Sequence, residues 1–406
     1  MEEGEGQAAL LSALEAFSRA VEPKEKTEAG CTAVDLLLKA QDRDGTKKIA
    51  AEVLSENFPL VSARPIMLHI AEKLSNAENE FKEEVGPHIL RQLKARAATF
   101  EEAISLFCEL MSEVYQASEE WRRAAEVLAE IPLSSGIRAI DDEYKLKTLL
   151  HIAQLYLEDD DPVQAEEYVQ RATPLVQSVT NVEQALVYKF CYVRILDTKR
   201  RFLEAASQYY DLSLPDRLGD LMEKISSDEL LETLSNACTC AILAPAGPKR
   251  SRILGLLHKD ERSSSLPLFP VLEKMYLERM LQKDEVAMFQ ETLKPHQLAL
   301  LGDGSTVLDK AVMEHNIRSA GLIYNSVKFE QLGDLLGLTA DKVATAAAQM
   351  IAEDRLNGTI DEPLGILAYD SGSAAKIKTW NKLIENACSA VSTIADIIQP
   401  PESTTR

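Results

Sequence analysis

Aromatic residues are scarce in this chain. Of its 406 residues only 6% are Phe, Trp or Tyr, although 46% are hydrophobic overall. A core made of aliphatic side chains and alanine favours packed helices over a β-sandwich. No apolar run approaches the roughly 18 residues that a membrane-spanning helix needs. The first residues, MEEGEGQAAL, lack the cationic and apolar segments of a signal peptide, so we expect neither a membrane span nor export.

Cysteine and positive charge are also in short supply. Six cysteines are scattered along the chain without the spacing of a disulfide framework, which is typical of a reducing compartment. Lys and Arg total 44 against 65 Asp and Glu, so the net charge is -21. Such a surface disfavours nucleic acids and anionic membranes as partners and favours basic proteins. We therefore expect a soluble protein of the cytoplasm and nucleus.

The motifs of common catalytic sites are missing as well. There is no Gly-Lys dipeptide for a phosphate-binding loop, no Gly-x-Ser-x-Gly elbow and no His-Glu-x-x-His zinc motif. Cys238 and Cys240 are the only close cysteine pair, and positions two apart on a helix face different ways. The acidic run ending at Asp161 lacks the glycine and distal glutamate of a calcium loop, so we predict a helix cap before Pro162. The sequence predicts no catalytic residue, no metal and no cofactor.

A repeat with a period near 40 residues runs through the middle of the chain. Three segments align without gaps: WRRAAEVL from Trp121, DPVQAEEY from Asp161 and FLEAASQY from Phe202. Each has an alanine at its fifth position, a large residue three later, and a helical segment before it. Because small residues let paired helices approach closely, we predict a right-handed, tetratricopeptide-like solenoid over residues 99–214. Residues 1–98 are predicted to be N-terminal helical repeats, with breaks at the charged stretch 22–28 and at 41–48.

Residues 215–327 continue as predicted helices, the first of them over 227–243, and the pattern then changes over residues 328–370. Apolar residues at helical spacing run from Phe329 to a stop at Gly337, and a second helix is predicted from Ala340 to Leu356 with Thr339 as its cap. Two short apolar runs up to Tyr369 then indicate a β-hairpin. This order predicts a small winged-helix module. Its predicted core is Phe329, Leu332, Leu335, Leu336, Val343, Met350 and Ile351.

The charge of this module argues against DNA. Residues 340–356 carry two positive and three negative charges, and the hairpin adds three acidic residues and no cation, whereas phosphate contacts need clustered cations. The alternative is protein assembly through a sheet edge, with the following residues as the predicted partner-contact wing: Thr359, Ile360, Leu364 and Ile366. Two basic clusters, at 199–201 and 249–252, are interpreted as solvated turns or as contacts to an acidic partner.

The chain closes with a predicted amphipathic helix. After a linker at 371–375, residues 376–398 carry apolar side chains along one stripe. Such a helix either folds back on its own domain or joins a bundle with partner helices. The predicted bundle residues are Ile377, Trp380, Leu383, Ile384 and Val391. This segment, 371–399, is followed by a tail at 400–406 that we expect to be disordered.

Together these features resemble the PCI-domain proteins, a family shared by the proteasome lid, the COP signalosome and translation initiation factor three. The resemblance covers about residue 99 to the wing, and its stretches look closest to a signalosome subunit. They are LYLEDDDPVQAEEYVQRA (155–172), KFCYVRILDTKRRFLEAASQYYDLS (189–213), AGPKRSRILGLLHKDERS (246–263), LEKMYLER (272–279), DGSTVLDKAVMEHNIRSA (303–320) and AQMIAEDRLNGTIDE (348–362).

The resemblance implies a mainly α chain that acts as a non-catalytic scaffold and substrate sensor. In the signalosome, a zinc isopeptidase on a different subunit removes the ubiquitin-like modifier from cullins. The implied partners are other PCI subunits, the metalloprotease-fold pair and a cullin–RING ligase as substrate, without nucleic acid or membrane. Two alternatives remain open at this point: a non-ATPase subunit of the proteasome lid, and a winged-helix nucleic-acid binder.

Overall fold

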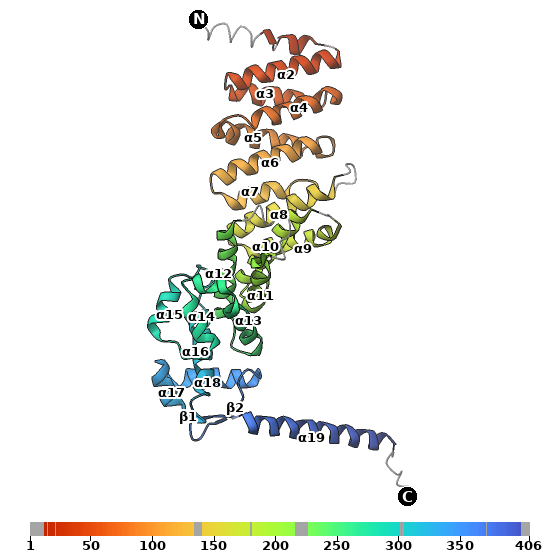
Figure 1. Ribbon diagram of the computed structural model, residues 1–406. Coiled ribbons are helices and arrows are strands. Elements are labelled where there is room, and N and C mark those ends of the chain that lie inside the picture. Colours follow the sequence, from red (N-terminus) through yellow and green to blue (C-terminus); the bar gives the residue numbers. More distant parts are fainter. Residues whose placement is uncertain are drawn as a thin grey trace. The chain divides into compact units, whose positions relative to one another are not determined.

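Helices make up most of the computed structural model, and three short strands lie near its C-terminal end (Figure 1). The structure describes residues 12–13, 15–20, 22–133, 140–178, 181–215, 226–300, 302, 304–370 and 372–398, with the side chains of 380–394 in the last helix. The chain divides into two compact units, Met1–Ile195 and Leu196–Arg406. None of the described helices is both long enough and apolar enough to cross a membrane.

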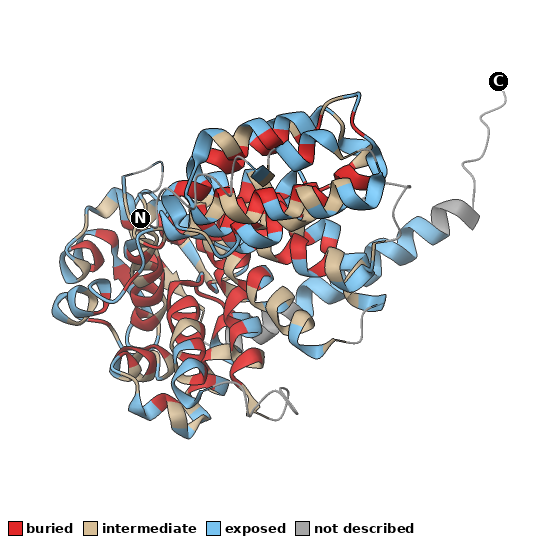
Figure 2. Cartoon of the chain, turned by 90° about the horizontal axis from the view of Figure 1, so that it is seen from above, coloured by how far each residue is buried: buried red, intermediate tan, exposed pale blue. Residues whose placement is uncertain are grey.

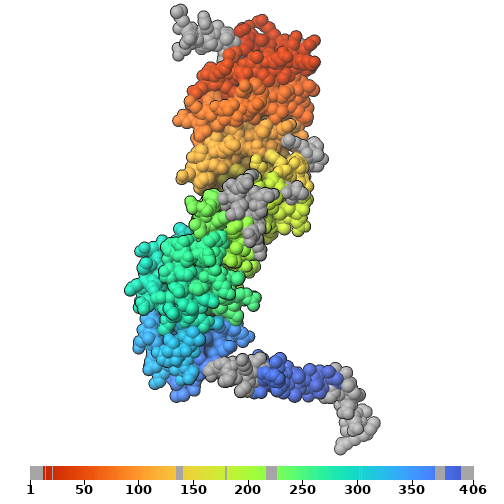
Figure 3. All heavy atoms as spheres, viewed as in Figure 1, coloured from red at the N-terminus to blue at the C-terminus, as the bar shows by residue number. Residues whose placement is uncertain are grey.

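The first unit is a stack of helices that follow one another in layers (Figures 1 and 3). The helices are α2 (Pro23–Lys39), α3 (Arg43–Val53), α4 (Leu60–Leu74), α5 (Asn79–Lys94), α6 (Glu101–Ala117), α7 (Trp121–Ala129), α8 (Asp142–Glu158), α9 (Pro162–Ser178) and α10 (Val182–Thr198), which ends beyond the unit's boundary. One aliphatic core, with few aromatic rings, runs through the unit from Phe17 to Ile195. Figure 2 shows the buried positions in red along the inward faces of the helices.

The small residues of the predicted repeat are buried, as close packing of paired helices requires. The recurring alanines Ala125, Ala165 and Ala206 are all 0% exposed, so a larger side chain there would collide with the paired helix. Asp161 caps α9 as predicted, because its Oδ1 accepts from the backbone N–H groups of Val163 and Gln164, both at 3.2 Å.

Two predictions for the first 60 residues are wrong. The charged stretch 22–28 lies mostly inside α2, because Pro23 starts the helix and Lys and Glu are good helix formers that stay on its exposed side. The expected break at 41–48 is short, since Asp42 accepts from the N–H of Gly45 and starts α3 at Arg43.

Among the described residues, the second unit places six whole α-helices before the winged-helix module. They are α11 (Phe202–Ser213), α12 (Ser227–Leu243), α13 (Pro248–Lys259), α14 (Phe269–Tyr276), α15 (Lys283–Gln290) and α16 (Val307–Ala320). The bounds of α12 match the predicted ones because a capping box of Ser226 and Glu229 fixes its start.

The winged-helix order is confirmed, with one strand that was not predicted. It runs β1 (Ser326–Lys328), α17 (Phe329–Leu336), α18 (Ala340–Ala352), β2 (Gly358–Asp361) and β3 (Ile366–Tyr369). The sheet is antiparallel in the order β1-β3-β2. Gly337 ends α17 in the left-handed conformation, with φ of 68°. Thr339 precedes α18 as expected, although its side chain makes no capping hydrogen bond.

The predicted core of this module is right at six of its seven positions. Phe329, Leu332, Val343 and Met350 are buried, and Leu336 and Ile351 are half-buried against them. Leu335 is 56% exposed, so its assignment to the core is wrong. The helix α17 has only eight residues and buries a single narrow face, which positions 329, 332, 333 and 336 occupy.

Two boundaries at the C-terminal end also differ from the predictions. The helix α18 ends at Ala352 rather than Leu356, because Asp354 takes the left-handed conformation (φ 54°) and turns the chain. The last helix, α19 (Gly372–Ile398), starts within the predicted linker. The predicted disordered tail, 400–406, lies outside the described residues.

Candidate assembly surfaces

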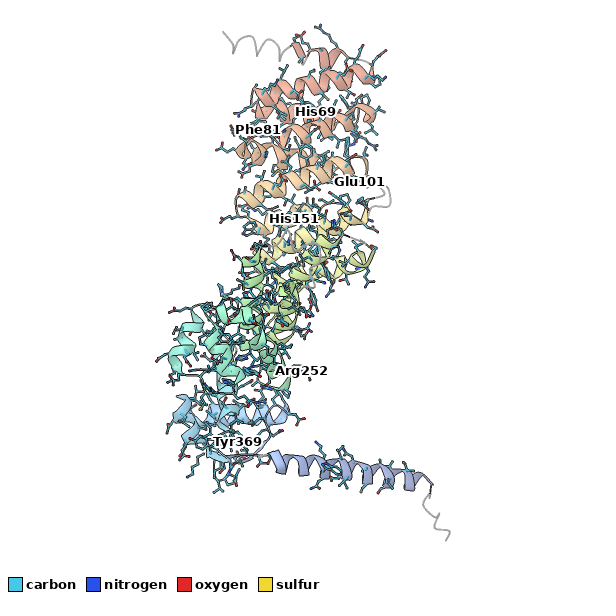
Figure 4. The ribbon with its side chains drawn as sticks, viewed as in Figure 1. His69, Phe81, Glu101, His151, Arg252 and Tyr369 are labelled. Carbon is cyan, nitrogen blue, oxygen red and sulfur yellow. The ribbon has the colours of Figure 1, made fainter. Side chains whose placement is uncertain are left out.

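A buried ion pair fixes the winged-helix module to the helical part of its unit. The carboxylate of Glu314 on α16, only 2% exposed, is paired with the guanidinium of Arg355, whose Nη2 donates to Oε1 at 3.1 Å. The same carboxylate accepts from the backbone N–H of Ala246 at 3.1 Å. A second bond comes from the sheet, where the hydroxyl of Tyr369 on β3 (Figure 4) donates to the carbonyl of Ile317 at 2.8 Å. These bonds hold the sheet and α18 in one orientation on α16.

The sheet that is held in this way has two outer strands. The strands β1 and β2 each pair only with β3 among the described strands, so each has one side whose backbone groups pair with no other described strand. Such edges can pair with a strand of another chain. Of the predicted wing contacts, Thr359 and Leu364 are exposed, whereas Ile360 and Ile366 are half-buried.

An apolar turn beside β1 was not identified from the sequence. Leu322 and Ile323, which follow α16, are 65% and 67% exposed, and Tyr324 is 40% exposed. The signal was present, since three large apolar residues in a row after Gly321 are unusual for a solvated turn. Gly321 is required here because a Cβ would lie 2.6 Å from the ring of Tyr369. The turn extends the apolar surface next to an open sheet edge.

The last helix carries the most extensive uncovered apolar stripe among the described residues. Trp380, Leu383, Ile384 and Val391 are between 52% and 67% exposed, although they share one face of α19. Ile394, which was not predicted, continues this stripe at 55% exposure. The side chain of Ile377 lies outside the description. Full burial of one such side chain contributes roughly 1.5–3 kcal/mol, so the stripe favours association with another apolar surface.

The close cysteine pair of the sequence, Cys238 and Cys240, is buried. Burial raises the pKa of Cys238 to about 12 and the pKa of Cys240 well above its usual value, so both thiols stay protonated. Among the described residues, no three His, Cys, Asp or Glu side chains gather as a metal site would require.

Arg250 corrects the interpretation of the second basic cluster as a solvated turn. It is 3% exposed, and it donates to the carbonyl of Ala244 at 3.0 Å and to Sδ of Met275 at 3.4 Å. Its neighbours Lys249 and Arg252 are exposed, and Figure 4 labels Arg252.

A stack of repeated helix pairs and a winged-helix module with free edges define a class, the helical scaffold with a C-terminal PCI domain. The family described as PCI domain matches residues 277–370, and the one described as PSMD12/CSN4, N-terminal, matches residues 7–218. A COP9 signalosome complex subunit 4 from Arabidopsis thaliana is 40% identical over 92% of this chain and 94% of its own length. The subunit 4 proteins of Dictyostelium discoideum and Drosophila melanogaster are 39% and 38% identical, over 96% and 88% of this chain and 97% and 86% of their own lengths. The chain belongs to the COP9 signalosome subunit 4 family.

This family membership confirms the resemblance found in the sequence, whose quoted stretches look most like subunit four of that complex. The fold class is confirmed with it. The division of the chain at residues 98, 214 and 327 stays a prediction, as do the contacts assigned to the wing and to the bundle helix.

Proposed function

We propose that the chain is a non-catalytic scaffold and substrate-sensing subunit of the COP9 signalosome. In this proposal it supports removal of the ubiquitin-like modifier from cullins by a zinc isopeptidase that a different subunit carries. The observation that carries the scaffold role is the uncovered stripe on α19, because an isolated chain gains nothing from exposing five large apolar side chains to water.

In this proposal the sheet edges, α19 and the first unit each contact a partner. The outer strands of the winged-helix sheet pair with the sheets of other PCI subunits, and α19 joins a bundle with their terminal helices and those of the metalloprotease-fold pair. The first unit contacts the cullin–RING ligase. The chain works in the cytoplasm and the nucleus, which the dispersed cysteines favour.

The runner-up is a subunit of the proteasome lid. The family that matches residues 7–218 takes its description from two proteins, PSMD12 and CSN4, so this half of the chain is compatible with either complex. The relatives named above favour the signalosome, since all carry the name of its subunit 4.

Native mass spectrometry of the tagged full-length chain, recovered from its own cells at near-physiological salt, tests the proposal. We expect a complex that contains a metalloprotease-fold pair and removes the modifier from cullins. Recovery with proteasome lid subunits would support the runner-up, and recovery of a lone chain with nucleic acid would overturn both.

A matched pair of variants tests which surface joins the complex. Leu383→Glu with Val391→Glu places two charges on the stripe of α19, and we expect the complex to be lost. Ser389→Glu with Thr393→Glu adds the same charge to the opposite face of the same helix, and we expect the complex to remain.

A further inference from the structure

Two hollows lie side by side in the first unit, on either side of α8. The first, of about 260 Å³, lies between α6 and α8, and the second, of about 410 Å³, lies between α8 and α10. Both are lined by Lys147 and His151, so they adjoin along α8; Figure 4 labels His151 at this place. We call them together the inner groove. Most of its lining residues come from three helices, α6, α8 and α10.

The charge of the inner groove is strongly one-sided. Glu109 and Glu113 line the first hollow and Glu143 and Glu183 the second, and among the described lining residues Lys147 is the one lysine or arginine. Burial, with Lys147 nearby, lowers the pKa of His151, and its Nε2 accepts from the amide of Gln116 at 3.0 Å, so this ring is neutral at pH 7. The described lining of the groove therefore carries four carboxylates and one ammonium group.

Two of these carboxylates are held in place by neighbouring helices. The hydroxyl of Tyr144 donates to Glu109 at 2.6 Å, and the amide of Asn181 donates to Glu143 at 2.6 Å. The first bond joins α8 to α6 across 35 positions, and the second joins the residue before α10 to α8 across 38 positions. A carboxylate that is already oriented loses less entropy when a ligand binds.

A buried acceptor in the second hollow also lacks a donor. The side-chain oxygen of Gln184 is buried and accepts no hydrogen bond from the described residues, while its nitrogen donates to the carbonyl of Glu143 at 3.3 Å. A buried acceptor without a donor costs about 1–3 kcal/mol, which a ligand that supplies an N–H group would recover. Peptide backbones and the side chains of Lys and Arg supply such groups.

We infer that the inner groove binds an extended peptide segment that carries lysine and arginine side chains. The cations pair with the four glutamates, and the N–H groups of the peptide reach the Gln184 oxygen. This inference deepens the substrate-sensing part of the proposed function and rests on it for the origin of the peptide. The binding itself is a property of this chain alone.

Fluorescence anisotropy with the full-length chain tests the inference. The probe is a fluorescein-labelled peptide of three Lys-Ser-Arg-Gly repeats, and a peptide of three Glu-Ser-Asp-Gly repeats is the control that we expect not to bind. Glu113→Lys with Glu183→Lys should weaken binding of the basic probe at least about tenfold. Lys147→Glu should strengthen it by roughly threefold, a gain that partial unfolding cannot produce.

Matched variants outside the groove separate local recognition from the general acidity of the chain. Glu56→Lys with Glu167→Lys changes the net charge as much as Glu113→Lys with Glu183→Lys does, but at two exposed positions outside the groove. Lys48→Glu is the corresponding control for Lys147→Glu. We expect these controls to change binding less than about twofold at near-physiological salt, where exposed distant charges are screened. Equal effects of groove and control variants would overturn the inference.

Different experimental results would contradict this inference and the proposed function. A chain that binds the basic probe in its groove but is recovered without signalosome subunits would keep the inference and remove the proposed function. A chain that assembles and supports removal of the modifier, with groove and control variants alike in probe binding, would keep the proposed function and remove the inference.

Discussion

Single side chains decide the orientation of the winged-helix module, and Glu314 is the clearest case. Moving a carboxylate out of water costs several kcal/mol, which only good partners offset. Glu314 has the guanidinium of Arg355 and the N–H of Ala246. Arg355 in turn donates to the exposed carboxylate of Glu353 at 2.6 Å. The two ion pairs share one cation but differ in burial, so their removal should differ in cost.

Glu314→Ala should lower the free energy of unfolding by roughly 3–5 kcal/mol, because it leaves the Arg355 charge without its buried partner. Glu353→Ala removes an exposed partner of the same arginine and should cost less than about 1 kcal/mol. Urea unfolding of both variants, followed by circular dichroism, gives the comparison. Equal losses would mean that the buried pair has no special role in holding the module.

His315, the next residue on α16, makes stability depend on pH. It is 3% exposed, its Nε2 donates to the carbonyl of Arg279 at 2.8 Å, and burial, with Arg250 nearby, lowers its pKa to about 4. An unfolded histidine has a pKa near 6.5, so the unfolded chain takes up the proton first as the pH falls. The stability that depends on neutral His315 is therefore complete above about pH 6.5 and is lost between about 6.5 and 4.

Between pH 7 and pH 5, the wild-type chain should lose about 2 kcal/mol more free energy of unfolding than His315→Gln. The glutamine keeps a donor for the Arg279 carbonyl but does not titrate. Urea unfolding at the two pH values measures the difference. The same loss in both chains would assign the pH dependence to other groups.

At the scale of the element, α19 offers a reporter in its own sequence. Cys388 is exposed and lies at the flank of the apolar stripe, within one turn of Ile384 and Val391. The buried thiols of the other helices are different, since burial raises the pKa of Cys108 and Cys191 to about 12. Thiol reactivity requires the thiolate and access to it.

Cys388 should therefore react first with a maleimide in the dilute chain, whereas Cys108 and Cys191 should react only on unfolding. When partner subunits cover α19, the reaction of Cys388 should slow at least about tenfold because access is lost. Peptide mapping by mass spectrometry identifies the labelled cysteine. An unchanged rate in the assembled complex would show that α19 is not buried there, contrary to the bundle prediction.

Elements with strong local signals were predictable, and those decided by distant contacts were not. The capping box of Ser226 fixed α12, and Gly337 fixed the end of α17. By contrast, α18 ends early where Arg355 turns toward Glu314, 41 positions away in the sequence. Leu335 was misplaced because hydrophobic spacing alone does not say how narrow the buried face of a short helix is.

The apolar stripe of α19 and the inner groove also differ in how far they could be predicted from the sequence. The stripe of α19 is continuous in sequence, so it could be predicted at Trp380, Leu383, Ile384 and Val391. The inner groove combines side chains from α6, α8 and α10, and even its hydrogen-bonded pairs are 35 and 38 positions apart in the sequence. No local pattern marks such a set, since an isolated glutamate on a helix is ordinarily a solvated one.

At the scale of the whole molecule, the net charge of -21 opposes the apolar stripe. Two copies of the chain that meet through α19 gain from burying apolar surface but repel one another through their acidic surfaces. Added salt shortens the range of that repulsion, from about 10 Å at 0.1 M to about 3 Å at 1 M, without weakening apolar burial. Self-association should therefore strengthen with salt.

Sedimentation equilibrium of the isolated chain at 50 mM and 500 mM NaCl should show a dissociation constant that falls at least about threefold at the higher salt. Leu383→Glu with Val391→Glu should stay monomeric in both. Binding of the basic peptide in the inner groove should respond oppositely, because salt screens the attraction that brings it there. The direction of the salt dependence therefore distinguishes association through α19 from peptide binding in the inner groove. Self-association that weakens with salt would mean that copies of the chain meet through charged groups rather than through α19.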